Sequence, residues 1–335
     1  MAIDPAFFPF ALSTPVVFFV FNRPELTRRV FAAIREARPP RLLVVADGPR
    51  PGRSEDAELC AQVRQLVLGG VDWPCDVRTD FADRNLGCGP RIFSGLQWAF
   101  GLVEEAILLE DDCLPHPTFF QYCQQMLERF RHEPKVFMVA GTNFGGARPG
   151  HADRSLLSRH CSIWGWATWR RALEGYSLDF SWWREGTGPA DLRAECADWR
   201  EHRFICDLFD SQKYGVVNTW DIQWFAHVFR RQGLSVVPGT NLISNLGTMG
   251  HHTNQRGQNH HLATSAAHFP LVVPNRLERD REYERVLVQH HRPPGGWILG
   301  RLANRALRGP AGPWLRRSWR TLKNLRSGPT PDGAP

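Results

Sequence analysis

The chain has 335 residues, of which 42% are hydrophobic and 22% charged, so it is long enough to bury one large core or two smaller ones and is not a disordered protein. Its formal net charge of +7 comes from the C-terminal end, since residues 1–270 contain 28 Lys and Arg against 29 Asp and Glu, and residues 271–335 contain 13 against 5. A neutral main part without a base-reading module argues against a nucleic-acid-binding protein.

The eight cysteines lie far apart, without a CxxC pair or a metal-ligand rhythm, in a chain too large to need disulfides for its stability. We therefore predict free thiols in a reducing, cytoplasmic setting. The apolar N-terminal residues have no basic leader and are interrupted by Pro9, Ser13 and Pro15, which argues against a signal peptide or a membrane span.

Strands and helices are predicted to alternate along the first 141 residues. In chain order they are a strand at 15–21, a helix at 25–37, a strand at 41–48, a helix at 54–68, a strand at 77–81, a helix at 90–103, a strand at 106–110, a helix at 117–131 and a strand at 136–141. Continuous apolar runs suit strands that are covered on both faces. The order predicts an α/β fold, with a mostly parallel, Rossmann-like sheet and helices on both faces.

Glu110, Asp111 and Asp112 directly follow a strand of apolar residues. Open parallel sheets hold their ligands at the carboxyl ends of the strands, and carboxylates gathered there usually need a cation. Oxygen ligands favour Mg²⁺ or Mn²⁺, and an ion shared with a diphosphate needs only one or two protein carboxylates. The cluster therefore favours a nucleotide-sugar site, and a solvated turn that caps the following helix is the alternative.

Polar residues also follow the first two predicted strands. Asn22 and Arg23 end the first strand, where Arg23 can make a forked contact to a diphosphate, and Asp47 ends the second, where it can accept a hydrogen bond from a base N–H. In the glycine-bearing segment 84–91, Arg84, Asn85 or Arg91 could contact the donor, although a plain loop and helix cap fit the same residues. No GxGxxG or Walker A sequence is present, so a dinucleotide or P-loop site is not expected.

Tryptophans are crowded between residues 157 and 229. Some must belong to the core, because large aromatic side chains usually do. Indole rings also stack on the flat C–H faces of sugars, so this density near an acidic cluster favours a carbohydrate acceptor.

Several segments, in this order along the chain, resemble motifs of one enzyme family. They are FVFNRPELTRRVFAAI, VVADG, AILLEDDCLPHPTFFQYCQQML, CSIWGWATW, TWDIQWF and LSVVPGTNLISNLGTMG. The chain resembles the metal-dependent GT-A glycosyltransferases over roughly residues 15–253, in particular the N-acetylglucosaminyltransferase I type and bacterial sugar transferases sometimes labelled hemolytic-protein-like. The most specific parts are EDD, a DXD-type motif with its Pro-x-Phe-Phe helix, and Trp-Asp-x-x-Trp.

The resemblance implies roles for the residues at the strand ends. Asp112 would be the direct metal ligand, Asp111 would hold the ribose, and Glu110 would lie near the donor sugar or base. Arg23 would contact the diphosphate and Asp47 the uracil. The implied cofactor is Mn²⁺ or Mg²⁺.

The resemblance also implies that Asp221 is the catalytic base, which would take a proton from the acceptor hydroxyl on the face opposite the leaving diphosphate and so invert the anomeric centre. An ordinary surface acid or a helix cap is the alternative. Ile222 and Gln223 stand where relatives often carry another acid, so the acceptor side is expected to differ. The expected walls of the sugar pocket are Trp164, Trp166, Trp220 and Trp224.

Two segments near the C-terminus carry further expectations. Residues 247–269 have the composition of a mobile loop that closes over a donor, in which His251 or His252 could touch the diphosphate or complete the metal shell; a simple connector is the alternative. Residues 297–326 contain eight basic residues and no acid, interleaved with Trp and Leu. They are expected to lie on an anionic membrane surface or to form an ordinary helix packed on the domain.

The sequence thus predicts a catalytic domain at 1–270, with a nucleotide-binding half at 15–150 and an acceptor half at 151–270, then a basic amphipathic extension at 271–326 and a disordered tail at 327–335. The expected activity is inverting, metal-dependent transfer of a sugar from a nucleotide diphosphate, UDP in the first place, to a carbohydrate or glycolipid hydroxyl in bacterial surface glycan synthesis. The expected place is the cytoplasm or its face of the inner membrane. A sugar-nucleotide-forming nucleotidyltransferase is an alternative, disfavoured because a glycine-rich first loop with its basic residue is missing, and a non-catalytic, membrane-associated transferase-like binding protein is another.

Overall fold

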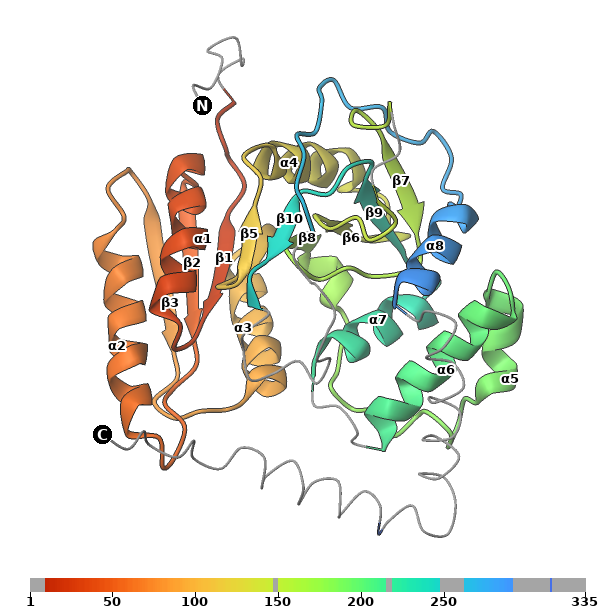
Figure 1. Ribbon diagram of the computed structural model, residues 1–335, viewed down its shortest axis with the longest axis horizontal. Helices are drawn as coiled ribbons and strands as arrows, with labels where there is room; N and C mark the ends of the chain where they lie inside the picture. The colour runs from red at the N-terminus through yellow and green to blue at the C-terminus, as the bar shows by residue number, and fades with distance from the viewer. Residues whose placement is uncertain (1–9, 147–149, 215–218, 248–261, 292–313, 315–335) are drawn as a thin grey trace, which may run out of the picture.

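The computed structural model describes residues 10–146, 150–214, 219–247, 262–291 and 314 (Figure 1). A central sheet of eight strands has the order β3-β2-β1-β4-β8-β6-β9-β7. The strands are β1 Val16–Val20, β2 Arg41–Ala46, β3 Asp76–Phe81, β4 Glu105–Glu110, β6 Val136–Ala140, β7 Ser155–Ser158, β8 Trp166–Trp169 and β9 Leu234–Pro238. The four strands β1 to β4 are mutually parallel, as are β6 and β9, while β8 and β7 run antiparallel to their neighbours.

Helices cover both faces of the sheet and enclose two hydrophobic cores. One face is covered by α1 Pro24–Ala37, α2 Ser54–Gly69 and α4 Thr118–Phe130, and the other by α3 Cys88–Leu102, α7 Asp221–Arg230 and α8 Arg281–His291. A third cluster joins α7 to α5 Pro189–Leu192 and α6 Trp199–Lys213, which lie beyond it. The short 3₁₀ helices are η1 Arg170–Leu173 and η2 Arg193–Glu195. The predicted α/β fold class is confirmed, and the arrangement is consistent with a Rossmann-like GT-A fold.

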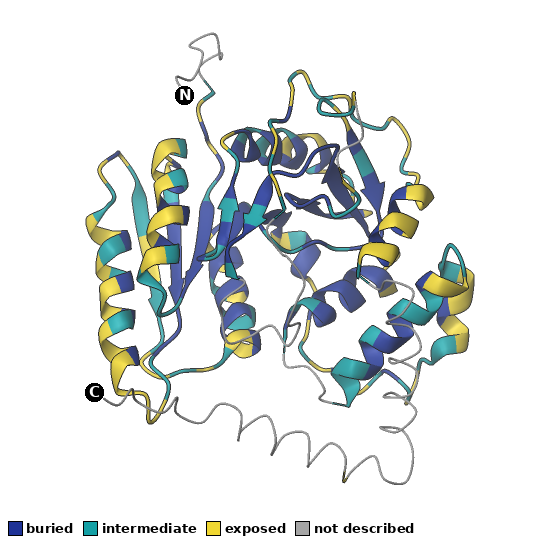
Figure 2. Ribbon diagram, viewed as in Figure 1, coloured by how far each residue is buried: buried dark blue, intermediate teal, exposed yellow. Residues whose placement is uncertain are grey.

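The apolar runs of the sequence explain why the sheet is buried on both sides (Figure 2). Along β1, Val16 and Phe18 face the first core, while Val17 and Phe19 face the second, and all four are buried. Successive side chains of a strand point to opposite faces, so a strand that is covered on both faces needs apolar residues at every position. The strands predicted at 15–21 and 136–141 are confirmed for this reason.

The strand order reverses at β1, which lies between β2 and β4. The helix that follows β1 lies on one face and the helix that precedes β4 lies on the other, so the carboxyl ends of β1, β2 and β4 open onto a crevice. Just beyond β4, β5 Cys113–Pro115 pairs antiparallel with β10 Ile243–Asn245 in a small second sheet. This pairing brings residues 243–247 of the chain beside the acidic cluster.

Part of the predicted C-terminal extension packs on the domain, since α8 contacts β7 and α6. Glu284 of α8 is fully buried, where it pairs with Arg279 and accepts a hydrogen bond from the Arg159 backbone at 2.8 Å. Apart from Trp314, the stretch 297–326 lies outside the described residues, as does the tail 327–335. Within the part of the chain that is described, no helix has the length and apolar character needed to cross a membrane.

Candidate active site

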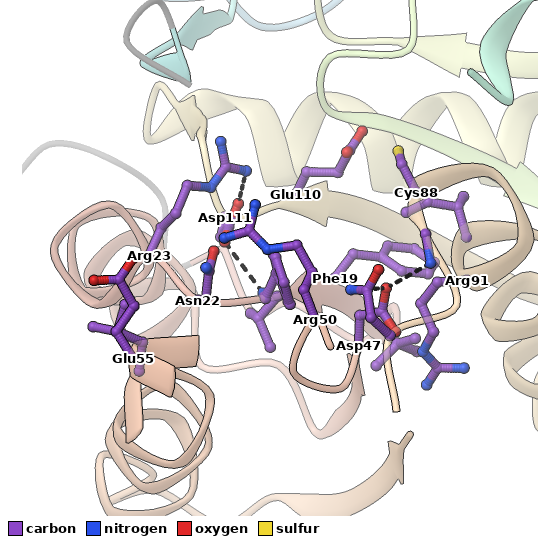
Figure 3. A pocket seen from close by; sticks show the side chains of 17 residues that line it. Phe19, Asn22, Arg23, Asp47, Arg50, Glu55, Cys88, Arg91, Glu110 and Asp111 are labelled. Carbon is purple, nitrogen blue, oxygen red and sulfur yellow. Dashed lines mark hydrogen bonds and ion pairs between the residues drawn. The ribbon is translucent and has the colours of Figure 1, made fainter. Parts of the chain in front are cut away.

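A cavity of about 370 Å³ opens where β1, β2 and β4 end (Figure 3). Its apolar floor comes from strand and helix residues such as Phe19, Val45 and Ile92. The polar side chains that line it are Asn22, Arg23, Asp47, Arg50, Glu55, Asn85, Arg91, Glu110 and Asp111. Most of the predicted strand-end residues are therefore brought together, whereas the predicted metal ligand Asp112 is not among the lining residues and is linked to them through Arg23.

Arg23 bridges two of the acids at the mouth of this cavity. Its Nη1 donates to Asp112 Oδ2 at 2.9 Å, and its Nη2 donates to Asp111 Oδ1. Asp111 also accepts the backbone N–H of Phe21 at 3.3 Å, and its side chain is only 3% exposed. Within the described part of the chain, Arg23 at the end of the neighbouring strand β1 is the cationic partner of both acids.

Burial and the crowding of negative charge raise the pKa values of Glu110 and Asp111. Burial, followed by repulsion from Asp112, raises the pKa of Glu110 to about 8, although the Arg23 charge acts in the opposite direction. Burial likewise raises the pKa of Asp111. An additional cation at this edge would relieve the repulsion.

The residues present fit a hard divalent cation bound together with a ligand. The described residues contain no group of three or more His, Cys, Asp or Glu side chains arranged to hold a metal ion by themselves. Asp112 is nevertheless 15% exposed, beside Gly247, where a Cβ atom would lie 2.4 Å from Asp112 Oδ2. The guanidinium of Arg23 shows that these carboxylates bind a positive charge. Carboxylate oxygens also suit Mg²⁺ or Mn²⁺ when diphosphate and water supply the remaining ligands.

Asp47 holds a loop in place. Its carboxylate accepts four hydrogen bonds of 2.8 to 3.1 Å, from the backbone N–H groups of Gly48, Leu86 and Gly87 and from the side chain of Asn85. A Cβ atom on Gly48 would lie 2.5 Å from the Arg84 backbone, so glycine lets the loop pass. A base N–H would therefore have to share or displace one of these donors, and the uracil contact remains a prediction.

Asn22 and Arg50 meet on a buried acid of α2. Asn22 Nδ2 donates to Asp56 Oδ1 at 2.8 Å, and Arg50 donates to both carboxylate oxygens at 2.6 and 2.8 Å. The hydrogen bonds from Arg50 hold the pKa of Asp56 well below its usual range. The Arg50 guanidinium also lies 5.4 Å from the centre of the Phe21 ring, so this group shapes one wall of the cavity.

The two other predicted arginines have different positions. Arg91 is 5% exposed and ties β2 to β3, donating to the Ala46 carbonyl at 3.2 Å and to Asp80 Oδ2 at 2.9 Å. It lines the cavity with its donors already engaged. Arg84 is exposed and does not line the cavity, so the prediction that it contacts a donor gains no support.

Asp221 begins α7 and approaches the cavity from the second half of the chain. Its Oδ1 accepts the Ile222 N–H at 2.9 Å and the Thr219 hydroxyl, and no donor to Oδ2 is found among the described residues. Burial raises the pKa of Asp221. The Asp221 charge contributes to the raised pKa of Glu110 and of Cys88, two residues that line the cavity, although Asp221 is not itself among the lining residues.

The predicted walls of a sugar pocket are corrected by the structure. Trp166, Trp220 and Trp224 are 3%, 3% and 0% exposed and pack on one another with ring centroids 5.0 to 5.8 Å apart, between α7 and the sheet. They are core residues, because burying a large aromatic ring stabilises the fold more than leaving it open does. Trp164 is partly buried against Phe144, and none of the four lines the described cavity.

The structure adds cavity residues to those predicted, among them Arg50, Glu55 and Cys88. Position in the chain could have indicated them, since Arg50 and Glu55 surround the start of α2 after β2, and Cys88 opens α3. The predicted ligands His251 and His252 lie outside the described residues.

The comparisons with known proteins leave the activity open. No protein-family model matches the sequence, and no curated protein does. Among solved structures, the chain is similar to S. aureus TarS 1–349, with a TM-score of 0.31 and 10% identity over 49% of this chain and 48% of that chain, so the match spans about half of the solved TarS segment. It is also similar to the inositol-1-phosphate CTP transferase from T. maritima, with a TM-score of 0.30 and 11% identity over 54% of this chain and 80% of that chain.

Proposed function

We propose that the chain is a nucleotide-sugar-dependent transferase, and more narrowly an inverting glycosyltransferase that uses a UDP-sugar with Mn²⁺ or Mg²⁺. The observation that carries the proposal is the meeting of three features at one sheet edge. These are a cavity between strand ends, the ion pairs of Arg23 with Asp111 and Asp112, and Asp221 from the second half of the chain, whose charge acts on Glu110 in the cavity lining.

The cavity suits the nucleotide part of a donor. Its volume of about 370 Å³ is within the range of small-molecule sites, and it has an apolar floor with polar groups above. A diphosphate at its mouth would lie within reach of Arg23, whose planar guanidinium matches phosphate oxygens in pairs. Asp112 would hold the cation and the neighbouring Asp111 the ribose; when bound, the cation neutralises charge on the leaving diphosphate.

Asp221 is suited to accept a proton. Its Oδ1 is engaged by Thr219 and the Ile222 N–H, which fixes the carboxylate plane and leaves Oδ2 to face an acceptor hydroxyl. The raised pKa of this carboxyl makes its ionised form a stronger base than an exposed aspartate. The acceptor would be a carbohydrate or glycolipid hydroxyl, and attack from the side opposite the diphosphate would invert the anomeric centre.

The proposal is tested by a thermal-shift panel of UDP, GDP, dTDP and CMP, each with and without MnCl₂, on the wild type and Asp112→Asn. A ligand that binds only the native state raises the melting temperature. We expect a shift with UDP and Mn²⁺ together that Asp112→Asn loses. The control is Asp76→Asn, because Asp76 lies at the amino end of β3, whereas the cavity lies at the carboxyl ends of the strands, and the variant should leave the shift unchanged. No shift with any nucleotide would contradict the proposal, and a shift with another base would correct the donor.

Slow release of UDP from a UDP-sugar with Mn²⁺ would then establish transfer chemistry. Release of pyrophosphate from UTP and a sugar phosphate would instead indicate a nucleotidyltransferase. Binding without either reaction, with any acceptor tested, would leave a transferase-like binding protein.

A further inference from the structure

We infer that Arg23 is a built-in counter-ion, which occupies the carboxylates of Asp111 and Asp112 until a diphosphate draws it away and so makes cation and diphosphate bind cooperatively. This inference rests on the proposed function for the identity of the two ligands. It assigns Arg23 a second role, toward Asp111 and Asp112, in addition to the expected contact with the diphosphate.

The first step is that Arg23 and a cation need the same oxygen atoms. Arg23 Nη1 lies 2.9 Å from Asp112 Oδ2, and Nη2 is paired with Asp111 Oδ1, so one face of each carboxylate is taken. A divalent ion on Asp112 Oδ2 would meet the guanidinium charge at contact distance, in surroundings where Asp111 is 3% exposed and screening by water is weak. The guanidinium must therefore move before a cation binds well.

The second step is that only the side chain of Arg23 is able to move. Its carbonyl accepts the Thr27 N–H at 2.9 Å and the Thr27 hydroxyl at 2.8 Å, which fixes the backbone at the start of α1. The side chain is 29% exposed at the cavity mouth, and its charged end is held by the two acids. Rotation about the side-chain bonds exchanges the acids for another anion without disturbing the helix.

The third step is that a diphosphate favours the same displaced state as the cation. It gives the guanidinium a new anionic partner, and it supplies further oxygen ligands, since the described residues contain no group of three or more acidic, Cys or His side chains that could hold a metal ion by themselves. Two ligands that each favour one state of a switching group bind with positive coupling, and the coupling is reciprocal. Arg23 thereby disfavours cation binding until the donor arrives.

The test measures Mn²⁺ binding without any nucleotide, from the electron paramagnetic resonance signal of free Mn²⁺ during titration with MnCl₂. Arg23→Met should bind Mn²⁺ at least about tenfold more tightly than the wild type, because one neighbouring opposite charge changes the proton affinity of a carboxylate by a factor of that order or more. Arg53→Met is the matched control, since Arg53 is an exposed arginine that caps α2 at the same edge, and its removal should leave Mn²⁺ affinity unchanged. Arg23→Lys, whose ammonium reaches only one of the two acids, should lie between the wild type and Arg23→Met, and it serves if Arg23→Met does not fold.

A second measurement gives the coupling itself. Equilibrium dialysis of radiolabelled UDP, with and without saturating MnCl₂, should show a larger stimulation by Mn²⁺ in the wild type than in Arg23→Met. Equal Mn²⁺ affinities in the wild type and Arg23→Met would overturn the inference, as would an equal increase of Mn²⁺ affinity in Arg23→Met and Arg53→Met. In either case, Mn²⁺-dependent UDP binding by the wild type would still support the proposed function. Absence of Mn²⁺ and UDP binding in every variant would overturn both.

Discussion

Asp221 has a carboxyl group whose pKa is raised by burial, and its Oδ2 has no hydrogen-bond donor among the described residues. If Asp221 is the base, as proposed, Asp221→Asn removes the proton acceptor and keeps the shape of the side chain, so transfer should fall by about 10² to 10⁴ while Mn²⁺-dependent nucleotide binding remains. Product release by chromatography and the thermal shift measure the two effects separately. Transfer that survives in Asp221→Asn would mean that another group takes the proton.

The same variant has a consequence for pH dependence. Since burial raises the pKa of Asp221 in the folded state, the folded chain binds this proton more tightly than the unfolded chain. Its contribution to stability is therefore lost as the pH rises from the ordinary carboxyl value through the raised one. Asp221→Asn should melt at a higher temperature than the wild type at neutral pH, and the wild-type rate of transfer should rise with pH across the raised pKa.

At the scale of structural elements, the loop before α3 depends on Asp47. In Asp47→Asn, an NH₂ group replaces one of the two carboxylate oxygens, and this group cannot accept a hydrogen bond. At least one buried N–H therefore loses its acceptor, which should lower the free energy of unfolding by about 1–3 kcal/mol. Gly87, with a φ of +83° at the N-cap of α3, fixes the loop shape that the carboxylate holds. Since the loop lines the cavity, UDP, CDP and GDP should all bind more weakly by a similar factor.

Urea unfolding and nucleotide titration check this prediction. A change in the preference among bases, without loss of stability, would show that the carboxylate contacts the base directly. Gln62→Ala is a suitable control, because Gln62 lies on the exposed side of α2 with only a hydrogen bond to Glu58.

The elements differ in how far the sequence could predict them. The strands β1, β2, β4 and β6 follow from continuous apolar runs, and the acids at the end of β4 follow from the position of its last residue. The strand β8 has only four residues and is set by pairing with β4 and β6, so its existence depends on partners far away in the chain. The Trp side chains were ambiguous for a physical reason, since a core and a sugar both favour a flat apolar ring.

Hydrogen bonds between distant residues are the part of the site that no local pattern contains. Asp47 has the expected place at a strand end, yet its four donors come from Gly48 and from residues 85–87. Arg23 likewise stands where a diphosphate contact was expected, and its pairing with Asp111 and Asp112 appears only once β1 and β4 are adjacent.

At the scale of the whole molecule, a buried polar network joins α8 to the two segments that carry His160 and Glu201. His160 Nε2 lies 2.8 Å from Glu201 Oε1, and Arg279 contacts both Glu201 and Glu284. Burial alone would raise the pKa of Glu201, but the hydrogen bonds from His160 and the Ala197 N–H outweigh it and lower the pKa to about 2. The described end of the chain is thus bound to the domain by charges as well as by apolar packing.

Glu284 is the member of this network whose loss should be felt most. It is fully buried and accepts from Arg279, from Ser158 and from the Arg159 N–H, so Glu284→Ala removes the nearer of the two acidic partners of Arg279 and leaves three donors without their acceptor. Removal of one partner from a buried pair costs about 3–5 kcal/mol, which urea unfolding should show. Glu282→Ala, on the exposed side of the same helix, should change the free energy of unfolding by less than about 0.5 kcal/mol. Hydrogen exchange should increase first in α8 of Glu284→Ala, and an equal loss of stability in the two variants would mean that helix propensity, and not the charge network, holds this segment on the domain.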